Sequence, residues 1–278
     1  MSALGTGPCH SAGRCDTEVR FMSSMAASAQ SRCTVVPAHP GMSHRAKLIA
    51  RELNLTVAKG LDQISDPVAL MVDDSDMWLQ ENKLSPPGPV RVDFASPAML
   101  YRRRGGHNEL LGKAVGIRRG RVPRVIDATA GLGRDAYVLA DLGCSVTMLE
   151  RSNVLALLLE EALKLALISP FDEVRRAAAR LSILRCDSTT FKADSDQVIY
   201  LDPMFEDRKG SAAAKKDLSV LQALHGAGAG HEELVAWAFS QPVARIVVKR
   251  PLKADVITKG SPAHVLRGKS IRFDVYSR

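Results

Sequence analysis

The amino-acid sequence predicts an α/β fold, in which a doubly wound, mostly parallel sheet is preceded by a small α/β subdomain. The first observation is that strand-like and helix-like segments alternate from Leu100 onward, which is typical of a parallel sheet with helices on both faces. The second is that this alternation ends in two strand-like runs, 264–267 and 271–276, joined by a short turn around Gly268-Lys269. Such a pair predicts an antiparallel hairpin at the end of the sheet.

The first hundred residues divide into two parts. Residues 1–33 are rich in Ser, Ala and Gly, contain no long apolar stretch of the secretory type, and are predicted to form a disordered leader. Residues 34–98 are predicted to form a small N-terminal α/β subdomain. Its expected elements are a helix at 43–53, where apolar residues recur with helical spacing, and strands at 69–72 and 90–94.

Residues 99–278 carry the alternating pattern and are expected to form the main domain. Its parallel strands are expected at 122–128, 145–150, 181–186, 197–201 and 244–249, and the terminal hairpin completes a seven-stranded sheet. Its helices are expected at 134–142, 153–168, 213–225 and 231–240. In an open sheet of this kind, ligands bind beyond the carboxyl ends of the strands, so a site is expected there.

The composition indicates a globular protein with a polyanionic partner. The formal net charge is +8 and 46% of the residues are hydrophobic, which allows a sizeable core and makes nucleic acid the favoured partner. No apolar run approaches the roughly 18 residues of a membrane span, so no membrane is expected. The five cysteines include no Cys-x-x-Cys pair, which predicts neither a metal site nor a disulfide framework and is typical of the cytoplasm.

A glycine-rich turn follows the first strand of the main sheet. Gly131 and Gly133 permit a positive φ and let the backbone approach a ligand. Asp127 precedes them, and Glu150 ends the second strand at a spacing where an acid typically hydrogen-bonds ribose hydroxyls. The next two strands end at Asp187, which is followed by Ser188, and at Asp202. Acids at matching strand ends predict a nucleotide-like ligand at this edge of the sheet.

The turn by itself leaves two ligands open. Gly131, Gly133 and Ala136 satisfy the G-x-G-x-x-G/A form of dinucleotide sites, so an NAD-dependent or other nucleotide-binding protein is one alternative. The acid at the end of the fourth strand argues against NAD, and the whole pattern resembles the S-adenosylmethionine-binding loop of class I methyltransferases. In that family the acid before the glycines orients the methionine end of the donor, the second-strand acid binds the ribose, and the third-strand Asp with its neighbour contacts adenine.

The fourth strand ends in YLDPMF, at 200–205. This segment resembles the (D/N)-P-P-(Y/F) signature of methyltransferases that modify exocyclic amino groups of bases. Such an amine is a poor nucleophile because its lone pair is delocalised into the ring, and Asp202 with the carbonyl at Pro203 can accept its two N–H bonds. Proline fixes the backbone, and Phe205 offers a face on which the base stacks. We therefore predict Asp202, Pro203 and Phe205 as the catalytic residues.

Several motifs together resemble one family. VIDATAGLGRDAY at 125–137, MLERSNV at 148–154, YLDPMF at 200–205 and VVKRP at 247–251 resemble, in order and spacing, the RsmJ family of bacterial 16S ribosomal RNA (guanine-N2)-methyltransferases. The resemblance implies a Rossmann-like methyltransferase sheet, S-adenosylmethionine as cofactor, and a specific guanosine in the 16S RNA of the 30S subunit as substrate. It places the donor against Asp127, Gly131, Gly133, Arg134, Asp135, Glu150, Arg151, Asp187, Ser188 and Asp202.

Basic residues close to these motifs are predicted to contact RNA phosphates. The predicted contacts are Arg102, Arg103, Arg104, Lys215, Lys216, Lys249 and Arg250. The run 118–124 is also basic, and we expect all these groups to face the carboxyl edge of the sheet. A DNA adenine or protein-glutamine N-methyltransferase is the alternative that uses the same donor, and the order of the motifs argues against it.

Overall fold

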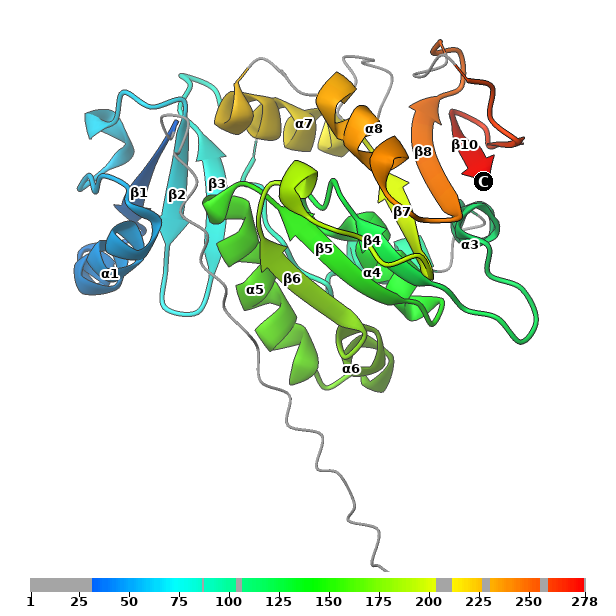
Figure 1. Cartoon of the computed structure of the whole chain (residues 1–278). Helices are drawn as coiled ribbons and strands as arrows, with labels where there is room; N and C mark the ends of the chain where they lie inside the picture. The colour runs from blue at the N-terminus through cyan, green and yellow to red at the C-terminus, as the bar shows by residue number, and fades with distance from the viewer. Residues whose placement is uncertain are drawn as a thin grey trace, which may run out of the picture.

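The computed structural model of the chain describes residues 32–86, 88–103, 107–203, 212–226, 231–255 and 260–277. These residues form a seven-stranded sheet with helices on both faces and, beside it, a three-stranded sheet (Figure 1). In the part of the chain so described, no helix is both long and apolar enough to cross a membrane. Residues 1–31 of the predicted leader lie outside the described residues, while Cys33 already begins the first strand and is buried.

The large sheet has the predicted architecture. Its strands are β4 (Arg124–Asp127), β5 (Ser145–Glu150), β6 (Leu181–Arg185), β7 (Gln197–Leu201), β8 (Arg245–Pro251), β9 (His264–Arg267) and β10 (Ile271–Ser277). They lie in the order β6-β5-β4-β7-β8-β10-β9. The first five pair in parallel, whereas β10 runs antiparallel to both β8 and β9. The predicted doubly wound sheet and its closing hairpin are therefore confirmed.

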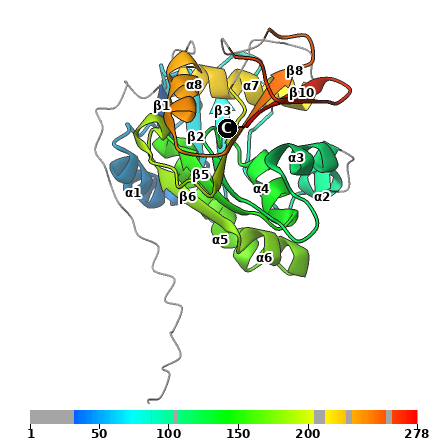
Figure 2. The ribbon, with the colours of Figure 1, turned by 45° about the vertical axis from the view of Figure 1, so that its right-hand side comes forward.

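Helices cover both faces of this sheet because its buried strands are apolar on both sides. The helices are α2 (Pro97–Arg103), α3 (His107–Val115), α4 (Arg134–Asp141), α5 (Asn153–Leu167), α6 (Asp172–Ala178), α7 (Ala212–His225) and α8 (His231–Ser240). On one face, Tyr137 of α4 packs in the same cluster as Met148 and Tyr200 of the strands. On the other, Trp237 of α8 packs with Ile199. Figure 2 shows α3 and α4 to one side of the sheet and α8 to the other.

The strand order creates the place where a ligand binds. The chain moves outward from β4 through β5 to β6 and then returns to the other side of β4 with β7. The connections after β4 and β7 therefore leave the sheet in opposite directions, which opens a crevice at the carboxyl ends of these two strands. Asp127 ends β4, and Asp202 directly follows β7, so both predicted acids stand at this crevice.

The small sheet differs from the prediction. It consists of β1 (Cys33–Pro37), β2 (Val68–Val72) and β3 (Met77–Glu81), with α1 (Ser43–Leu53) packed on β1. The predicted strand at 90–94 is wrong, because only Val90 pairs there, as an isolated bridge to Leu79. Strand β2 instead pairs with β1 on one side and with β3 on the other, and the residues of β3 alternate between buried and half-buried. The predicted helix at 43–53 is confirmed.

The two sheets share one cluster of apolar side chains. Val35 and Leu70 of the small sheet belong to the same buried cluster as Leu155 of α5 and Val220 and Leu224 of α7. Helix α7 also contacts both β2 and β3. The small sheet is thus covered by helices that follow strands of the large sheet. The division of the chain at 98/99 stays a prediction.

Candidate functional site

The glycine turn between β4 and α4 forms the floor of the crevice. Both glycines have the left-handed backbone that favours this residue, with φ of 53° at Gly131 and 69° at Gly133. A Cβ at Gly133 would lie 2.7 Å from Cδ2 of Leu159, so this glycine lets α4 approach α5. A Cβ at Gly131 would meet only the carbonyl oxygen of Thr129, at 3.8 Å. The backbone at Gly131 is therefore open to a ligand.

Glu150, at the end of β5, holds this turn in place. Its Oε2 accepts a hydrogen bond from the amide of Gly131 at 3.1 Å, and its Oε1 accepts one from the amide of Ser152 at 2.8 Å. Burial raises the pKa of Glu150 to about 7, although both amides favour the ionised form. The carboxylate therefore links the glycine turn to the start of α5 and titrates near neutral pH.

Asp127 is buried at the end of β4. Its Oδ1 accepts a hydrogen bond from the amide of Thr129 at 3.0 Å. Burial raises its pKa to about 7, the Thr129 amide opposes this rise, and the nearby carboxylates of Asp135 and Asp202 add to it. A group that needs an acceptor, such as an ammonium ion, would favour the ionised form of this side chain.

At the end of β6, Asp187 and Ser188 are engaged in local structure. Oδ1 of Asp187 accepts hydrogen bonds from the amide of Thr189 at 2.8 Å and from its hydroxyl at 2.6 Å, which caps the short 3-10 helix η3 (Ser188–Thr190). The hydroxyl of Ser188 donates to the carbonyl of Ala128 at 2.7 Å. This bond ties the end of β6 to the end of β4, and the predicted contact of both residues with adenine stays a prediction.

Lys249 of β8 joins two carboxylates at the crevice. Its Nζ lies 2.7 Å from Oδ2 of Asp202 and 2.7 Å from Oδ2 of Asp135, the second residue of α4. The amide of Asp202 donates to the hydroxyl of Thr129 at 2.7 Å, which fixes the chain after β7 against the turn after β4. Within the described residues, Oδ1 of Asp202 accepts no hydrogen bond. That oxygen remains available to a substrate donor.

The charges of this group are set by burial and by its cations. Burial raises the pKa of Asp202, Lys249 lowers it again, and Asp135 adds to the rise. The pKa of Asp135 is below its usual range, because Lys249 and Arg102 outweigh the effect of its burial. Asp135 also accepts a hydrogen bond from Arg102 and, at 2.7 Å, one from the hydroxyl of Tyr200. Asp135 is therefore the permanent anion of the group.

Sequence reasoning missed part of this network. Tyr200 is fully buried and donates to Asp135, and Asp217 of α7 accepts a hydrogen bond from Arg134 at 2.6 Å. Arg134 begins α4, and α7 is the first described helix after β7, so this ion pair links the helices on either side of the crevice. The only sequence signal for it was an acid on the otherwise apolar side of a predicted helix. Such a signal does not identify the partner.

The remaining predicted site residues take different positions. Pro203 is buried directly after Asp202. Arg151 is exposed at the end of β5. The pKa of His225 on α7 is lowered to about 4, mainly by the burial of its side chain and next by the positive charge of Arg151. Phe205 lies outside the described residues, so its predicted stacking role stays a prediction.

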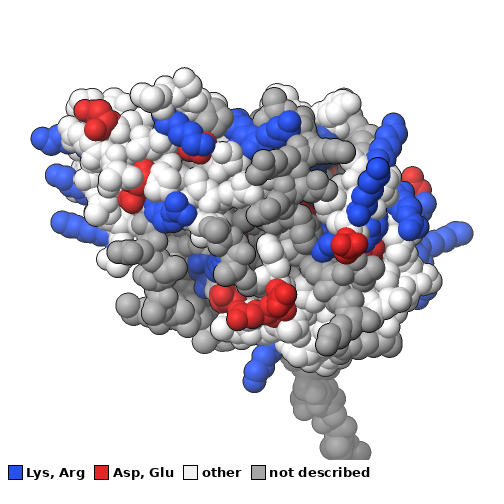
Figure 3. Space-filling view, turned by 90° about the horizontal axis from the view of Figure 1, so that it is seen from above, with Lys and Arg blue, Asp and Glu red and all other residues white. Residues whose placement is uncertain are grey.

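The residues predicted to bind RNA do not form a single surface. Lys215 is exposed on α7, whereas Lys216 donates to the carbonyl of Pro89 at 2.9 Å. Lys249 is occupied by the two acids, and Arg250 is buried. Arg104 and the side chain of Arg103 lie outside the described residues. Viewed from above, where α7 and α8 lie, the face shows basic side chains spread around it with acidic ones among them (Figure 3).

The expectation that Lys249 and Arg250 reach RNA phosphates does not fit their environment. Both belong to β8, an inner strand between β7 and β10. Side chains of an inner strand point into the layers on either face, so basic character alone does not bring them to the surface. Arg250 donates to the carbonyl of Asp255 at 2.5 Å.

The placement expected for the basic run 118–124 was also wrong. Arg124 is the first residue of β4, so the run lies at the amino end of that strand. All parallel strands of the sheet begin on this side, and the crevice with Asp202 lies on the other. A segment that enters a strand cannot face the edge where the strand ends.

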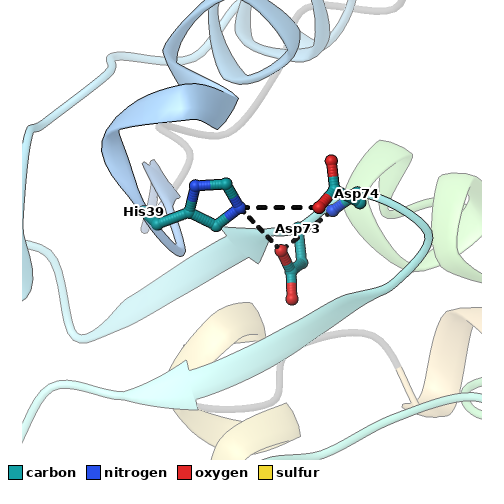
Figure 4. Close-up of side chains that lie close together, drawn as sticks. All are labelled: His39, Asp73 and Asp74. Atoms are coloured by element: carbon teal, nitrogen blue, oxygen red, sulfur yellow. Dashed lines mark hydrogen bonds and ion pairs between the residues drawn. The ribbon is translucent and has the colours of Figure 1, made fainter.

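One group of possible metal ligands occurs within the described residues, at the turn between β2 and β3. His39 lies 3.3 Å from Asp73 and 3.6 Å from Asp74, and all three are partly or fully exposed (Figure 4). Arg45 donates to the carbonyls of both aspartates, so a cation already occupies this turn. The group is explained by the exposed contacts of His39 with the two carboxylates and by the hydrogen bonds of Arg45, and its residues take no part in the crevice.

The chain is similar to known methyltransferases over most of its length. Residues 49–278 match the family described as "Putative SAM-dependent methyltransferase". Ribosomal RNA small subunit methyltransferase J of Ectopseudomonas mendocina is 41% identical over 243 residues, which cover 85% of this chain and 92% of that protein. The protein of the same name from Pseudomonas aeruginosa is 39% identical over 262 residues, which cover 91% of this chain and 98% of that protein.

A solved structure shows the same fold. The crystal structure of a SAM-dependent methyltransferase from Neisseria gonorrhoeae superimposes with a TM-score of 0.65 and 30% sequence identity. The match covers 88% of this chain and 95% of that protein. The arrangement of the sheet around the crevice is therefore one that methyltransferases of this kind use.

Proposed function

We propose that this chain methylates N2 of a guanosine in 16S ribosomal RNA. The chain belongs to the S-adenosylmethionine-dependent methyltransferase family that includes ribosomal RNA small subunit methyltransferase J. The observation that carries the proposal is the meeting of the Gly131 turn, Glu150 and Asp202 at one crevice. Family membership makes the chain an enzyme with this methyl donor. The base, the atom and the roles of the residues are the proposed part.

The residues of the crevice fit S-adenosylmethionine. The donor presents O–H groups from its ribose and N–H groups from its amino acid and adenine, and these need acceptors. Four neighbouring strands end in carboxylates here, and each carboxylate oxygen accepts two hydrogen bonds. Glu150 therefore retains acceptor capacity after binding Gly131 and Ser152. We assign Glu150 to the ribose, Asp127 to the methionine end and Asp187 with Ser188 to adenine.

Asp202 acts on the base to be methylated. Lys249 holds Oδ2 of Asp202, so Oδ1 is left to accept an N–H from the exocyclic amine. The buried Pro203 fixes the adjacent carbonyl, which accepts the second N–H. Together these bonds direct the nitrogen lone pair out of the plane of the ring. The donor supplies a methyl group on a positively charged sulfur, which is already electrophilic, so positioning is the main task of the protein. As the N–C bond forms, the S–C bond breaks and S-adenosylhomocysteine leaves, while the nitrogen releases one proton, which Oδ1 of Asp202 is placed to accept.

The substrate side follows from charge and access. The net charge of +8 favours RNA, and the exposed Lys215 on α7 is among the groups that we propose to contact phosphates. A guanine in a helix hides its amino group, so the target base leaves its stack before it enters the crevice. Ribosomal RNA as substrate places the activity in the cytoplasm, and direct transfer to an amine requires no metal.

The decisive test is transfer of a tritiated methyl group from S-adenosylmethionine to 30S subunits and to bare 16S RNA from cells that lack this activity. Nucleoside analysis is expected to find N2-methylguanosine. Label in N6-methyladenosine would overturn the choice of base. Label in neither RNA, with S-adenosylhomocysteine binding intact, would overturn the choice of RNA.

Asp202→Ala tests the mechanism separately from the substrate. The variant is expected to bind S-adenosylhomocysteine and to lose transfer by about 100-fold or more, since it removes a group that acts in the transition state. Glu232→Ala, which removes an exposed acid at the start of α8, is the matched control. Activity of Asp202→Ala close to that of the control would exclude Asp202 from the reaction.

A further inference from the structure

A pocket of about 450 Å³ lies at the amino edge of the large sheet, opposite the crevice. Its walls come from the loop after α3 and from the starts of β7 and β8, including Gln197 and Arg245. Figure 1 shows this loop, between α3 and β4, extending past the sheet. Arg245 and Lys249 are four residues apart on β8, which separates the pocket from the crevice by roughly 13 Å along the strand.

Three arginines converge on this pocket. Arg118 and Arg121 pair through their backbones, with N···O distances of 3.1 and 2.9 Å, across a tight turn that contains Gly120 in the left-handed conformation. This pairing places both side chains at the pocket wall. Arg245 enters from β8 and is anchored by a hydrogen bond from Nη1 to the carbonyl of Ala114 at 3.0 Å.

Gly116 lets the loop close over Arg245. Its φ is 91°, and a Cβ there would lie 3.3 Å from Nε of Arg245. A side chain at this position would strain the backbone and would require the guanidinium to shift by a few tenths of an ångström. The loop geometry is therefore fitted to a half-buried arginine, which an ordinary solvated charge does not need.

The positive charge of the pocket is not neutralised from within the described residues. Among the described residues, Asp196 is the one carboxylate that lines the pocket, and it accepts hydrogen bonds from Arg124 outside the pocket, at 3.1 and 3.3 Å. The pKa of Arg245 is lowered first by burial and then by Arg121 and Arg118. The mutual repulsion of three neighbouring guanidinium groups raises the electrostatic free energy of the pocket. An anion bound between them would offset this repulsion.

We propose that the pocket lined by Arg118, Arg121 and Arg245 binds a phosphate group of the substrate RNA, at a distance from the nucleotide that is methylated. The inference rests on the proposed function for the identity of the RNA. Arginine matches phosphate because its planar fork donates two parallel hydrogen bonds to the oxygens. A second contact on the opposite edge of the sheet needs a substrate that extends around the molecule, which a folded ribosomal RNA does.

The test compares two double variants of the whole chain. Arg118→Gln/Arg121→Gln removes two charges from the pocket, and Arg51→Gln/Arg176→Gln removes two exposed arginines from α1 and α6 as the matched control. For each we would measure kcat and KM for 30S subunits over a range of salt concentrations, the affinity for S-adenosylhomocysteine and the melting temperature. The last two measurements show that the protein is folded and that the crevice is intact.

The pocket variant is expected to raise KM by about fivefold to twentyfold while kcat and donor affinity stay unchanged, and to reduce the slope of log affinity against log salt by about 1 to 2. The control is expected to match the wild type. A pocket variant with the KM and salt slope of the control would overturn the proposal. A second result would also overturn it: inorganic phosphate raises the melting temperature of the wild type but not of the pocket variant, while the two proteins bind RNA equally well. The occupant of the pocket would then be a small free anion.

Failure of the proposed function is distinguishable from failure of this inference. If the wild type transfers no methyl group to 30S subunits, binding of fluorescently labelled 16S RNA is measured instead, by anisotropy at several salt concentrations. A weaker affinity and a smaller salt slope for the pocket variant than for the control would still support an RNA phosphate in the pocket. Equal slopes would overturn it.

Discussion

The ammonium group of Lys249 lies between the carboxylates of Asp135 and Asp202 and compensates part of the negative charge of both. Lys249 lies 2.7 Å from each, and Asp135 is further bound by Arg102 and Tyr200. Burial raises the pKa of Asp202, Lys249 is the one cation in contact with it among the described residues, and the more distant charge of Arg102 lowers its pKa less than Lys249 does. The ionised form of Asp202, which the reaction needs to accept an N–H, therefore depends on Lys249.

Lys249→Met is expected to shift the acid limb of the pH–rate profile to higher pH. Without the cation the pKa of Asp202 rises further, so a higher pH is needed to ionise it, and the rate at neutral pH falls by about tenfold or more. Single-turnover methyl transfer measured between pH 5.5 and 9 tests this, with Lys253→Met, at an exposed position after β8, as control. An acid limb at the wild-type position would show that Lys249 does not set the charge of Asp202.

Glu150 gives a second pH dependence, in donor binding. Its pKa of about 7 means that the fraction ionised rises as the pH rises through 7, so affinity for S-adenosylhomocysteine is expected to increase over the same range. Glu150→Gln is expected to weaken affinity by about tenfold or more at pH 8 and to flatten the profile, since an amide cannot accept from both Gly131 and Ser152 as a carboxylate does. Calorimetric titrations between pH 6 and 8.5 measure both effects. Equal pH dependence of donor affinity in the two proteins would contradict the assignment of this dependence to Glu150. A weaker dependence that remains in the variant would report the ionisation of Asp127.

The positions of the acids could be predicted from the sequence, but their partners could not. Asp127, Glu150 and Asp202 each follow an apolar run, and the ends of parallel strands meet at one edge, so their convergence follows from periodicity. Lys249 was assigned to RNA because basic residues near a site suggest phosphate contacts. Its contacts with Asp135 and Asp202 depend on which strands become neighbours, and a linear pattern does not contain this information.

At the scale of elements, the approach of α4 to α5 depends on one glycine. Gly133 and Gly120 both have positive φ, of 69° and 76°, yet a Cβ at Gly133 would meet Leu159 at 2.7 Å and Phe94 at 3.1 Å, whereas nothing lies within 4 Å of one at Gly120. The two positions therefore separate the cost of backbone strain from the cost of a clash between helices.

Gly133→Ala is expected to destabilise the fold by about 2–4 kcal/mol, and Gly120→Ala by about 1 kcal/mol, because only the first adds overpacking to the strain of a left-handed residue. Urea unfolding of both variants, with the affinity for S-adenosylhomocysteine, measures the difference. Donor affinity is expected to fall for Gly133→Ala alone. Equal destabilisation of the two variants would mean that α4 and α5 adjust to the extra methyl group without cost.

Elements were predicted best where one period dominates. The strands of the large sheet and α5 were placed within two residues of their bounds, with β4 beginning two residues later and β8 ending two residues later than expected. Strand β3 was missed because Met77–Glu81 has three apolar residues followed by two polar ones, without the alternation typical of a half-buried strand, and lies close to the Pro-rich loop. The strand predicted at 90–94 failed because a strand requires a partner, and β3 pairs there through Val90 alone.

At the scale of the whole molecule, the small sheet contributes to the support of the crevice. Its cluster includes Leu155 of α5, the helix that follows Glu150, and Val220 of α7, the helix that carries Asp217. Asp217 in turn binds Arg134 at the start of α4. The first hundred residues therefore stabilise two of the helices that border the donor turn.

Removal of residues 1–98 is expected to abolish cooperative folding. The truncation would expose the side chains of Val154, Leu155, Leu158, Val220 and Leu224, all now buried. Burying each of them contributes about 1.5–3 kcal/mol, so the loss is comparable with the roughly 5–15 kcal/mol by which an ordinary domain is stable. Thermal unfolding followed by circular dichroism, together with binding of a hydrophobic dye, measures the effect.

The matched truncation removes only residues 1–31, which precede β1 in the sequence, lie outside the described residues and are predicted from the sequence to form a leader. This chain is expected to melt cooperatively at the wild-type temperature and to bind S-adenosylhomocysteine with wild-type affinity. If the chain of residues 99–278 behaved in the same way, the main domain would fold independently of the small sheet, which would support the predicted division at 98/99. If it instead bound the dye and lost donor affinity, the two sheets form a single cooperative unit, in which the packing of α5 and α7 against the small sheet holds the donor turn in place.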